Sequence, residues 1–171
     1  MQWVTPCKPN HPKLLNTHDL DLRSDNRADA FMSMQNFAHQ HGELLAQADA
    51  IVRAVKAGTD TALRDLPALR LGFSRLVNSH CSVEIRLVNA RAAEMDKDAD
   101  KTKLLRRFHD ELLMWRGDLM DCNASWPQRR VADDRAGFLA AFRGLNDRLK
   151  ARVRWEEQVF YPAIFATPGK R

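Results

Sequence analysis

Apolar side chains recur along most of this chain at intervals of three and four residues, which is the spacing of one face of an α-helix. Four such stripes predict four long helices, over about 24–57, from about 61 to at least Val88, from about 98 to before Ser125, and from about 133 through Pro162. No stretch alternates with a period of two over more than a few residues, so no β-strand is expected. Four long amphipathic helices with short links predict an all-α protein, an antiparallel up-down-up-down four-helix bundle.

Residues that favour helix ends punctuate these stripes. The first helix is expected to be capped near Ser24 and Asp25, and the second by Thr61 or Asp65. The third is expected to begin between Asp98 and Thr102, and the fourth has Asp133 and Asp134 as its cap and first-turn acid. Gly58 is expected to end the first helix, and Pro67 suits the first turn of the second. Pro162 is expected to tighten or bend the last turns of the fourth helix.

The helical stripes set the domain boundaries. Residues 1–26 contain Pro6, Pro9 and Pro12, which stand too close together for a helix. We expect an extended N-terminal arm over 1–26 that lies along the body of the protein. The bundle then covers 27–165, and 166–171 form a short C-terminal tail.

Every predicted helix carries an ionisable side chain on its own apolar stripe. These side chains are His41 in the first helix, His80 and Glu84 in the second, His109 in the third, and Arg152 and Glu156 in the fourth. Charged groups on a buried face are costly unless they meet a partner or a metal ion. Facing side chains at similar depth in a bundle form one internal site, and imidazole with carboxylate suits iron, manganese or zinc.

The order of these residues resembles that of hemerythrin-like (HHE) domains. Those domains have a lone His on the first helix, His-x-x-x-Glu on the second, a lone His on the third, and His-x-x-x-Glu-Glu-x-x-Leu-Phe-Pro on the fourth. The chain has His41, then His80-Cys-Ser-Val-Glu84, then His109, then Arg152-Val-Arg-Trp-Glu156-Glu-Gln-Val-Phe-Tyr-Pro162, so the resemblance spans about 30–165.

The resemblance implies a non-haem di-iron carboxylate site. His41, His80 and His109 would be terminal nitrogen ligands, and Glu84 and Glu156 would be bridging carboxylates. The implied roles are oxygen binding, sensing of nitric oxide or redox state, or iron handling. The expected partner is then a small diatomic ligand. No general base or nucleophile stands out beyond the ligands, so turnover of an organic substrate is not expected.

Arg152 departs from the family pattern, because it stands where the fourth-helix histidine is expected. Arginine stays protonated and does not coordinate metals. Three outcomes remain open: water or Glu157 completes a site for two ions; one ion is held by some of the five ligands; or no metal binds and the guanidinium neutralises Glu84 and Glu156. The functional alternatives are therefore a protein that binds iron, with zinc or manganese as substitutes, and a metal-free helical regulatory or interaction module.

Some of these residues have simpler interpretations when they are taken singly. His41 and His109 would each be read as a hydrogen-bonded core histidine. Cys81 is rotated off the apolar stripe of its helix and is expected to be a small core or boundary residue, with a redox-active thiol beside the site as the alternative. Tyr161 is expected at the boundary at the end of the bundle, with control of access to the site or electron transfer as the alternative. Val159 is expected to face the core. It is the joint occurrence of the polar residues on four helices that favours a metal site.

Composition narrows the class of protein. The chain has 171 residues, enough for one domain, and lacks an apolar run long enough for a membrane span. Its N-terminus lacks a secretory pattern, so a cytoplasmic protein is expected. The three widely spaced cysteines, Cys7, Cys81 and Cys122, are expected to be reduced thiols. The basic residues behind the net charge of +5 are interleaved with acidic residues, which argues against nucleic-acid binding. A monomer or a homodimer is expected.

Overall fold

The computed structural model of the chain describes residues 17–94 and 98–165, with the side chains of 35–94 and 98–165. Regular structure in these ranges is helical throughout, without strands, which confirms the all-α prediction for this part of the chain. The elements are α1 (Thr17–Ala57), α2 (Asp60–Glu94), α3 (Ala99–Ser125), α4 (Gln128–Asp133), α5 (Arg135–Trp155), the π-helical turn η1 (Glu156–Phe160) and α6 (Tyr161–Phe165).

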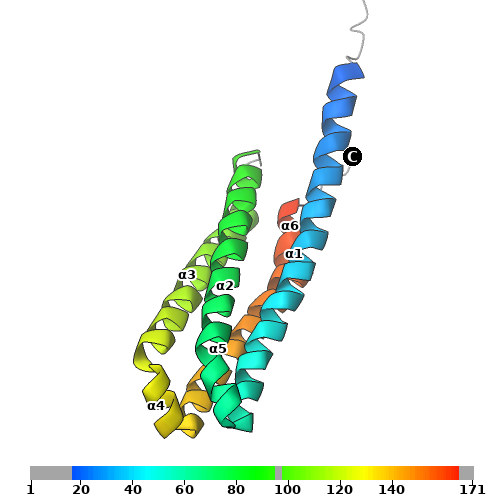
Figure 1. Cartoon of the computed structure of the whole chain (residues 1–171). Coiled ribbons are helices and arrows are strands. Elements are labelled where there is room, and N and C mark those ends of the chain that lie inside the picture. The colour runs from blue at the N-terminus through cyan, green and yellow to red at the C-terminus, as the bar shows by residue number, and fades with distance from the viewer. Residues whose placement is uncertain (1–16, 95–97, 166–171) are drawn as a thin grey trace, which may run out of the picture.

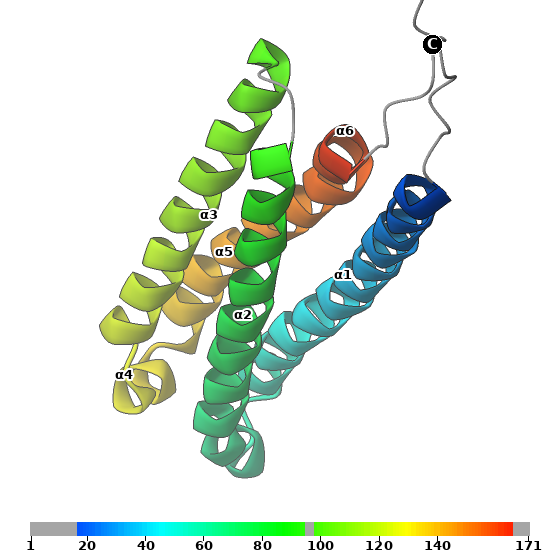
Figure 2. The same ribbon diagram turned by 90° about the horizontal axis from the view of Figure 1, so that it is seen from above.

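The four longest helices lie alongside one another as in a helical bundle (Figure 1). Helix α1 packs against α2 and α5, and α3 packs against α5. The view from above shows α2 beside α3, with α5 running on into α6 (Figure 2). None of the described helices combines the length and the apolar content needed to cross a bilayer.

Several predicted helix ends are confirmed. Gly58 follows α1 with a φ of 61°, a left-handed conformation that suits glycine. Asp98 caps α3, where its side chain accepts hydrogen bonds from the backbone N–H groups of Asp100 and Lys101. At α5 the cap is Asp134, one residue later than expected, and its side chain accepts from the N–H of Gly137. These short polar side chains satisfy N–H groups that have no partner inside the helix.

The start of the first helix differs from the prediction. Helix α1 begins at Thr17, not at Ser24 or Asp25. Residues 17–26 are therefore helical rather than part of an extended arm, and the N-terminal turns of α1 extend past the end of α6 (Figure 1). The three prolines that suggested the arm precede this segment and lie outside the described residues.

The second helix also begins earlier than predicted. Helix α2 starts at Asp60, and the cap is Thr59, whose Oγ1 accepts from the N–H of Ala62 at 3.2 Å. Pro67 consequently lies inside the helix rather than in its first turn. Proline has no N–H, so the carbonyl of Leu63 loses its helical donor.

The side chain of Gln128, the first residue of α4, replaces that donor. Its Nε2 donates to the carbonyl of Leu63 at 2.5 Å. A short helix that the apolar pattern did not predict thus supports the proline position in α2.

Aromatic side chains fill much of the core between the helices. The fully buried phenylalanines are Phe37, Phe73, Phe108, Phe138, Phe142 and Phe160. Each of these rings contacts another aromatic ring; Phe108 of α3 and Phe160 of η1, for example, stack with centroids 4.6 Å apart. Burying a side chain of this size stabilises the fold by about 1.5–3 kcal/mol.

The last turns of the bundle are widened rather than tightened. The N–H of Tyr161 donates to the carbonyl of Glu156, five residues back, which is the π-helical pattern. Pro162 follows directly, and in an α-turn its ring would clash with the carbonyl of Gln158. The wider turn relieves that clash.

The widened turn changes which side chains enter the core. Val159, which the stripe placed inside, is 47% exposed, whereas Phe160 is fully buried and Tyr161 is 3% exposed. The expectation that Tyr161 is a boundary residue is therefore wrong. An additional residue in the turn rotates the following side chains by about 100° relative to a regular α-helix, and this rotation brings Tyr161 inside.

Candidate metal centre

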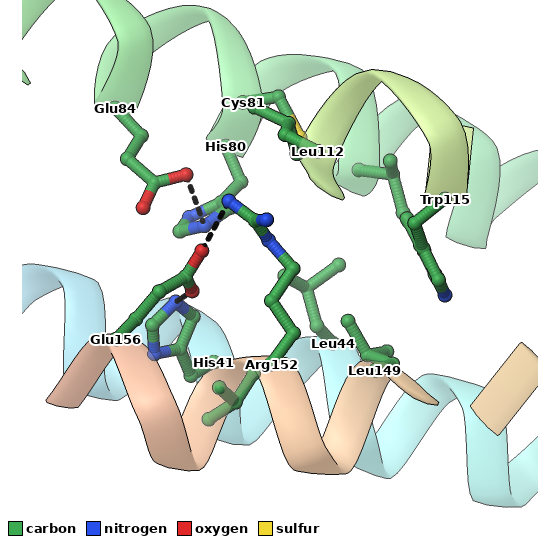
Figure 3. A pocket seen from close by; sticks show the side chains of 12 residues that line it. His41, Leu44, His80, Cys81, Glu84, Leu112, Trp115, Leu149, Arg152 and Glu156 are labelled. Carbon is green, nitrogen blue, oxygen red and sulfur yellow. Dashed lines mark ion pairs between the residues drawn. The ribbon is translucent and has the colours of Figure 1, made fainter. Parts of the chain in front are cut away.

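Four of the five predicted ligands meet in one enclosed cavity between the helices. The cavity has a volume of about 10 Å³, about the space that one water molecule requires. Its polar lining consists of His41 from α1, His80 and Glu84 from α2, Arg152 from α5 and Glu156 from η1. Figure 3 shows these side chains pointing toward one another, with apolar side chains such as Leu44 and Leu112 around them.

His41 is held by carboxylates on both ring nitrogens. Its Nδ1 lies 2.9 Å from Glu157 Oε1. Its Nε2 lies 3.3 Å from Glu156 Oε2, and Figure 3 shows this second contact. Burial alone would lower the pKa of His41, but Glu156, Glu157 and Glu84 together outweigh it, so the pKa is above its ordinary value. The hydrogen bond to Glu157 places a proton on Nδ1 and turns Nε2 toward the cavity.

His80 has the same orientation with a neutral partner. Its Nδ1 lies 2.9 Å from Gln40 Oε1, and its Nε2 lies 3.5 Å from Glu84 Oε2. Burial, followed by the neighbouring His41 and Arg152, lowers the pKa of His80 to about 3. The ring is therefore neutral at physiological pH, which is the form that binds metal ions.

Glu84 is 1% exposed and has one oxygen that lacks a hydrogen bond. The hydroxyl of Tyr161 donates to Oε1 at 2.6 Å, whereas Oε2 is buried without a hydrogen-bond partner. Burial, followed by repulsion from Glu156, raises the pKa of Glu84 to about 7. A buried carboxylate oxygen without a donor is costly, and a cation in the cavity would offset that cost.

These three residues satisfy the spatial requirement of a metal site. One ligand atom from each of His41, His80 and Glu84 can be chosen so that all lie within 4.8 Å of one another. No other group of His, Cys, Asp and Glu with this property occurs within the described part of the chain. Two imidazoles and a carboxylate form a donor set that suits iron, manganese and zinc.

Arg152 and Glu156 form a buried ion pair at the edge of this group. Arg152 Nη2 lies 2.5 Å from Glu156 Oε1, and the two side chains are 7% and 2% exposed. Arg152 Nη1 also donates to the carbonyl of Phe108 at 3.2 Å, and the guanidinium lies over the Phe108 ring. Glu156 is thus shared, with Oε1 toward Arg152 and Oε2 toward His41.

The structure does not bring His109 to the cavity. His109 is half-buried on α3, where its Nδ1 donates to the carbonyl of Leu105 at 2.8 Å and its Nε2 lies 3.1 Å from Asn89 Oδ1. The adjacent residue, Phe108, is fully buried and faces Phe160 instead. Successive helical side chains are about 100° apart, so one phenylalanine on the core face turns His109 away.

Three residues of the site lie outside the predicted ligand set: Gln40, Cys81 and Tyr161. Tyr161 stands five residues after Glu156 and directly before Pro162, and this proline is the one signal in the sequence that helical geometry is irregular here. Gln40 carries no comparable signal. Cys81, which was expected to be a core or boundary residue, is buried and lines the cavity.

Both described cysteines, Cys81 and Cys122, are free thiols, as predicted, and Cys7 lies outside the described residues. Burial, followed by the nearby Glu84, raises the pKa of Cys81 to about 12. This thiol therefore remains protonated beside the cavity and is a poor nucleophile in the metal-free protein.

Comparisons with protein-family models, with curated proteins and with solved structures each find no match to this chain. The resemblance to hemerythrin-like domains therefore rests on the order of the site residues along the chain and on the cluster that they form.

Proposed function

We propose that this protein is a metal-binding bundle of hemerythrin-like type, with the antiparallel up-down-up-down arrangement of its four long helices. The metal is a transition metal, with iron as the first candidate and zinc or manganese as substitutes. His41, His80 and Glu84 would hold it, with Glu156 beside them. His109, which the sequence pattern included, is not part of the proposed ligand set.

The observation that carries this proposal is the orientation of the two imidazoles. Each ring has its Nδ1 on an oxygen acceptor, Glu157 for His41 and Gln40 for His80, and each turns its Nε2 toward the cavity. Histidines that bind metals typically donate their other ring N–H to an acceptor in this way. The unpartnered oxygen of Glu84 lies in the same place and supplies the negative charge.

The surroundings of the site suit the binding of a small molecule. When bound, iron supplies redox chemistry and an open coordination position toward oxygen or nitric oxide. The residues of the chain orient the imidazoles, hold Glu84 through Tyr161 and enclose the cavity with apolar side chains. The cavity, of about 10 Å³, is far smaller than the pockets that hold organic substrates, so the proposed role is binding of a diatomic molecule or sensing of redox state rather than turnover of such a substrate.

A second candidate function is a metal-free helical module for regulation or interaction. The ion pair between Arg152 and Glu156 favours it, because the guanidinium neutralises one of the two buried carboxylates. The raised pKa of His41 also favours the metal-free state, because a protonated ring between Glu156 and Glu157 would add a second positive charge beside the buried carboxylates. Metal binding would have to displace that proton.

Metal analysis separates the two functions. Protein purified without an affinity tag is treated with chelator, loaded with Fe²⁺ under anaerobic conditions and desalted. The bound metal per chain is then measured by elemental mass spectrometry. If the protein binds metal, we expect at least about one ion per chain. His41→Ala should lose the ion, whereas the control His39→Ala, which changes an exposed side chain, should keep it. Less than about a tenth of an ion per chain for iron, zinc and manganese alike would exclude the metal-binding function.

A further inference from the structure

We infer that the cavity holds one metal ion rather than two, and that the guanidinium of Arg152 takes the place of a second cation. The inference rests on the proposed metal binding and specifies the number of ions and the kind of coordination. It starts from the position of Arg152, which is 7% exposed and lines the same cavity as His41, His80 and Glu84.

The available ligand atoms suffice for one ion. The described residues form a single three-ligand group, His41, His80 and Glu84. A second ion would need Glu156 together with further donors. Arg152 already contacts Glu156 Oε1 at 2.5 Å, and Glu157 is engaged by His41 Nδ1 at 2.9 Å.

The remaining predicted nitrogen ligand is also engaged elsewhere. His109 lies outside the cavity, and its Nδ1 donates to a backbone carbonyl of its own helix. Arg152 itself supplies no lone pair, because a guanidinium remains protonated in proteins. The second position therefore has a carboxylate but no nitrogen donor within the described residues.

The charge of the cavity leads to the same number. With the imidazoles neutral, as metal ligands are, and both carboxylates ionised, the lining residues Glu84, Glu156 and Arg152 leave an excess of one negative charge. One divalent ion would leave the cavity with a single net positive charge. Two divalent ions would instead leave several uncompensated positive charges buried beside an arginine. Uncompensated charge in an enclosed site is strongly unfavourable.

A single ion on two imidazoles and one carboxylate belongs to a different class from a carboxylate-bridged pair. This donor set, with open positions, is typical of mononuclear non-haem iron(II) sites and of zinc sites with three protein ligands. In this arrangement Glu156 is a partner of Arg152 and His41 rather than a bridge between two ions.

Counting bound ions tests the inference with Mn²⁺ as the probe. Wild type, Arg152→His and the control Arg154→His are loaded and desalted, then compared by metal content and by electron paramagnetic resonance. Arg154 is exposed on the same helix, so the control adds a histidine outside the cavity. We expect about one ion per chain with the spectrum of an isolated ion in wild type and control, and about two ions with the spectrum of a coupled pair in Arg152→His.

Other outcomes separate the inference from the proposed function. Two ions in wild type overturn the inference and leave metal binding intact. A folded Arg152→His that still binds one ion overturns the assignment of Arg152 as the second cation. If that variant does not fold, Arg152→Gln, which removes the charge and offers an amide oxygen, is judged by the same count. No bound ion in wild type overturns the proposed function, and the inference with it.

Discussion

Tyr161 is the side chain that links the end of the bundle to the candidate ligands. Its hydroxyl donates to Glu84 Oε1 at 2.6 Å, and its ring stacks on Phe37 and lies parallel to His41. Burial, followed by the carboxylates of Glu84 and Glu156, raises the pKa of Tyr161, so the phenol keeps its proton. Glu84 is thereby fixed with Oε1 on the phenol and Oε2 left without a hydrogen bond.

Removing this hydroxyl tests its role. We expect Tyr161→Phe to weaken metal binding by about 10- to 100-fold, the usual cost of losing a partner of a metal-binding carboxylate. Competition with a chromophoric chelator measures the affinity, and Val159→Ala, a change at an exposed position of the same segment, serves as the control. An affinity that matches wild type in Tyr161→Phe would contradict the assigned role.

Alanine substitutions of His80 on α2 and of His109 on α3 should differ sharply in their effect on metal content. His80→Ala removes an imidazole that lines the cavity, so we expect it to abolish stoichiometric binding. His109→Ala removes a ring that contacts the Leu105 carbonyl and the Asn89 side chain outside the cavity. We therefore expect metal content to stay within about twofold of wild type. Loss of metal in a folded His109→Ala would restore the ligand set that the sequence pattern suggested.

At the scale of helices, two prolines decide where regular geometry fails. Pro67 leaves the Leu63 carbonyl without a helical donor, and Gln128 supplies one from α4. Pro162 adjoins the π-helical turn that brings Tyr161 inside. In each case a residue that is unfavourable inside a helix fixes a contact between elements distant in sequence.

A double-mutant cycle measures the contact at Pro67. Gln128→Ala removes the donor to Leu63, and we expect the free energy of unfolding to fall by about 0.5–1.5 kcal/mol. In a Pro67→Ala background the restored N–H can donate to the same carbonyl, so the cost of Gln128→Ala should shrink toward zero. Chemical denaturation of the four proteins gives the coupling energy, and equal costs in both backgrounds would show that Gln128 acts by another route.

The apolar stripes predicted most of the helical architecture because a period of 3.6 residues holds over long runs of α1, α2, α3 and α5. Caps at Asp98 and Asp134 were also predictable, because short acidic side chains there satisfy free N–H groups. The π-helical turn was not predictable from a constant period. Once the turn widens, every later residue is rotated, which is why Val159 and Tyr161 exchange their expected places.

The candidate site was predictable where one helix supplies neighbouring residues. His80 and Glu84 are one turn apart on α2, so their meeting follows from helical geometry alone. His109 was not decidable in this way, because it and Phe108 both border the apolar stripe and only packing against Phe160 chooses between them. Gln40 acts through a contact between helices that no local pattern marks. Glu157 was considered as a possible metal ligand, but its contact with His41 is likewise set by packing between helices.

For the molecule as a whole, metal binding should appear as stability. A ligand that binds only the folded state at 100 times its dissociation constant adds about 2.7 kcal/mol. For a chain of this size we expect Tm to rise by about 5–10 °C with Fe²⁺ under anaerobic conditions, and to return to its starting value with chelator. Glu84→Ala should show no such rise. A Tm that is unchanged in wild type at saturating metal would contradict specific binding to the fold.

The central claim is that His41, His80 and Glu84 hold a metal ion inside the bundle. Anomalous scattering from crystals of the iron-loaded protein, recorded on both sides of the iron absorption edge, tests it most directly. We expect one anomalous peak per chain among these three side chains, with Arg152 still paired to Glu156. Loaded crystals with no peak in the cavity, or with iron bound only at the surface, would contradict it.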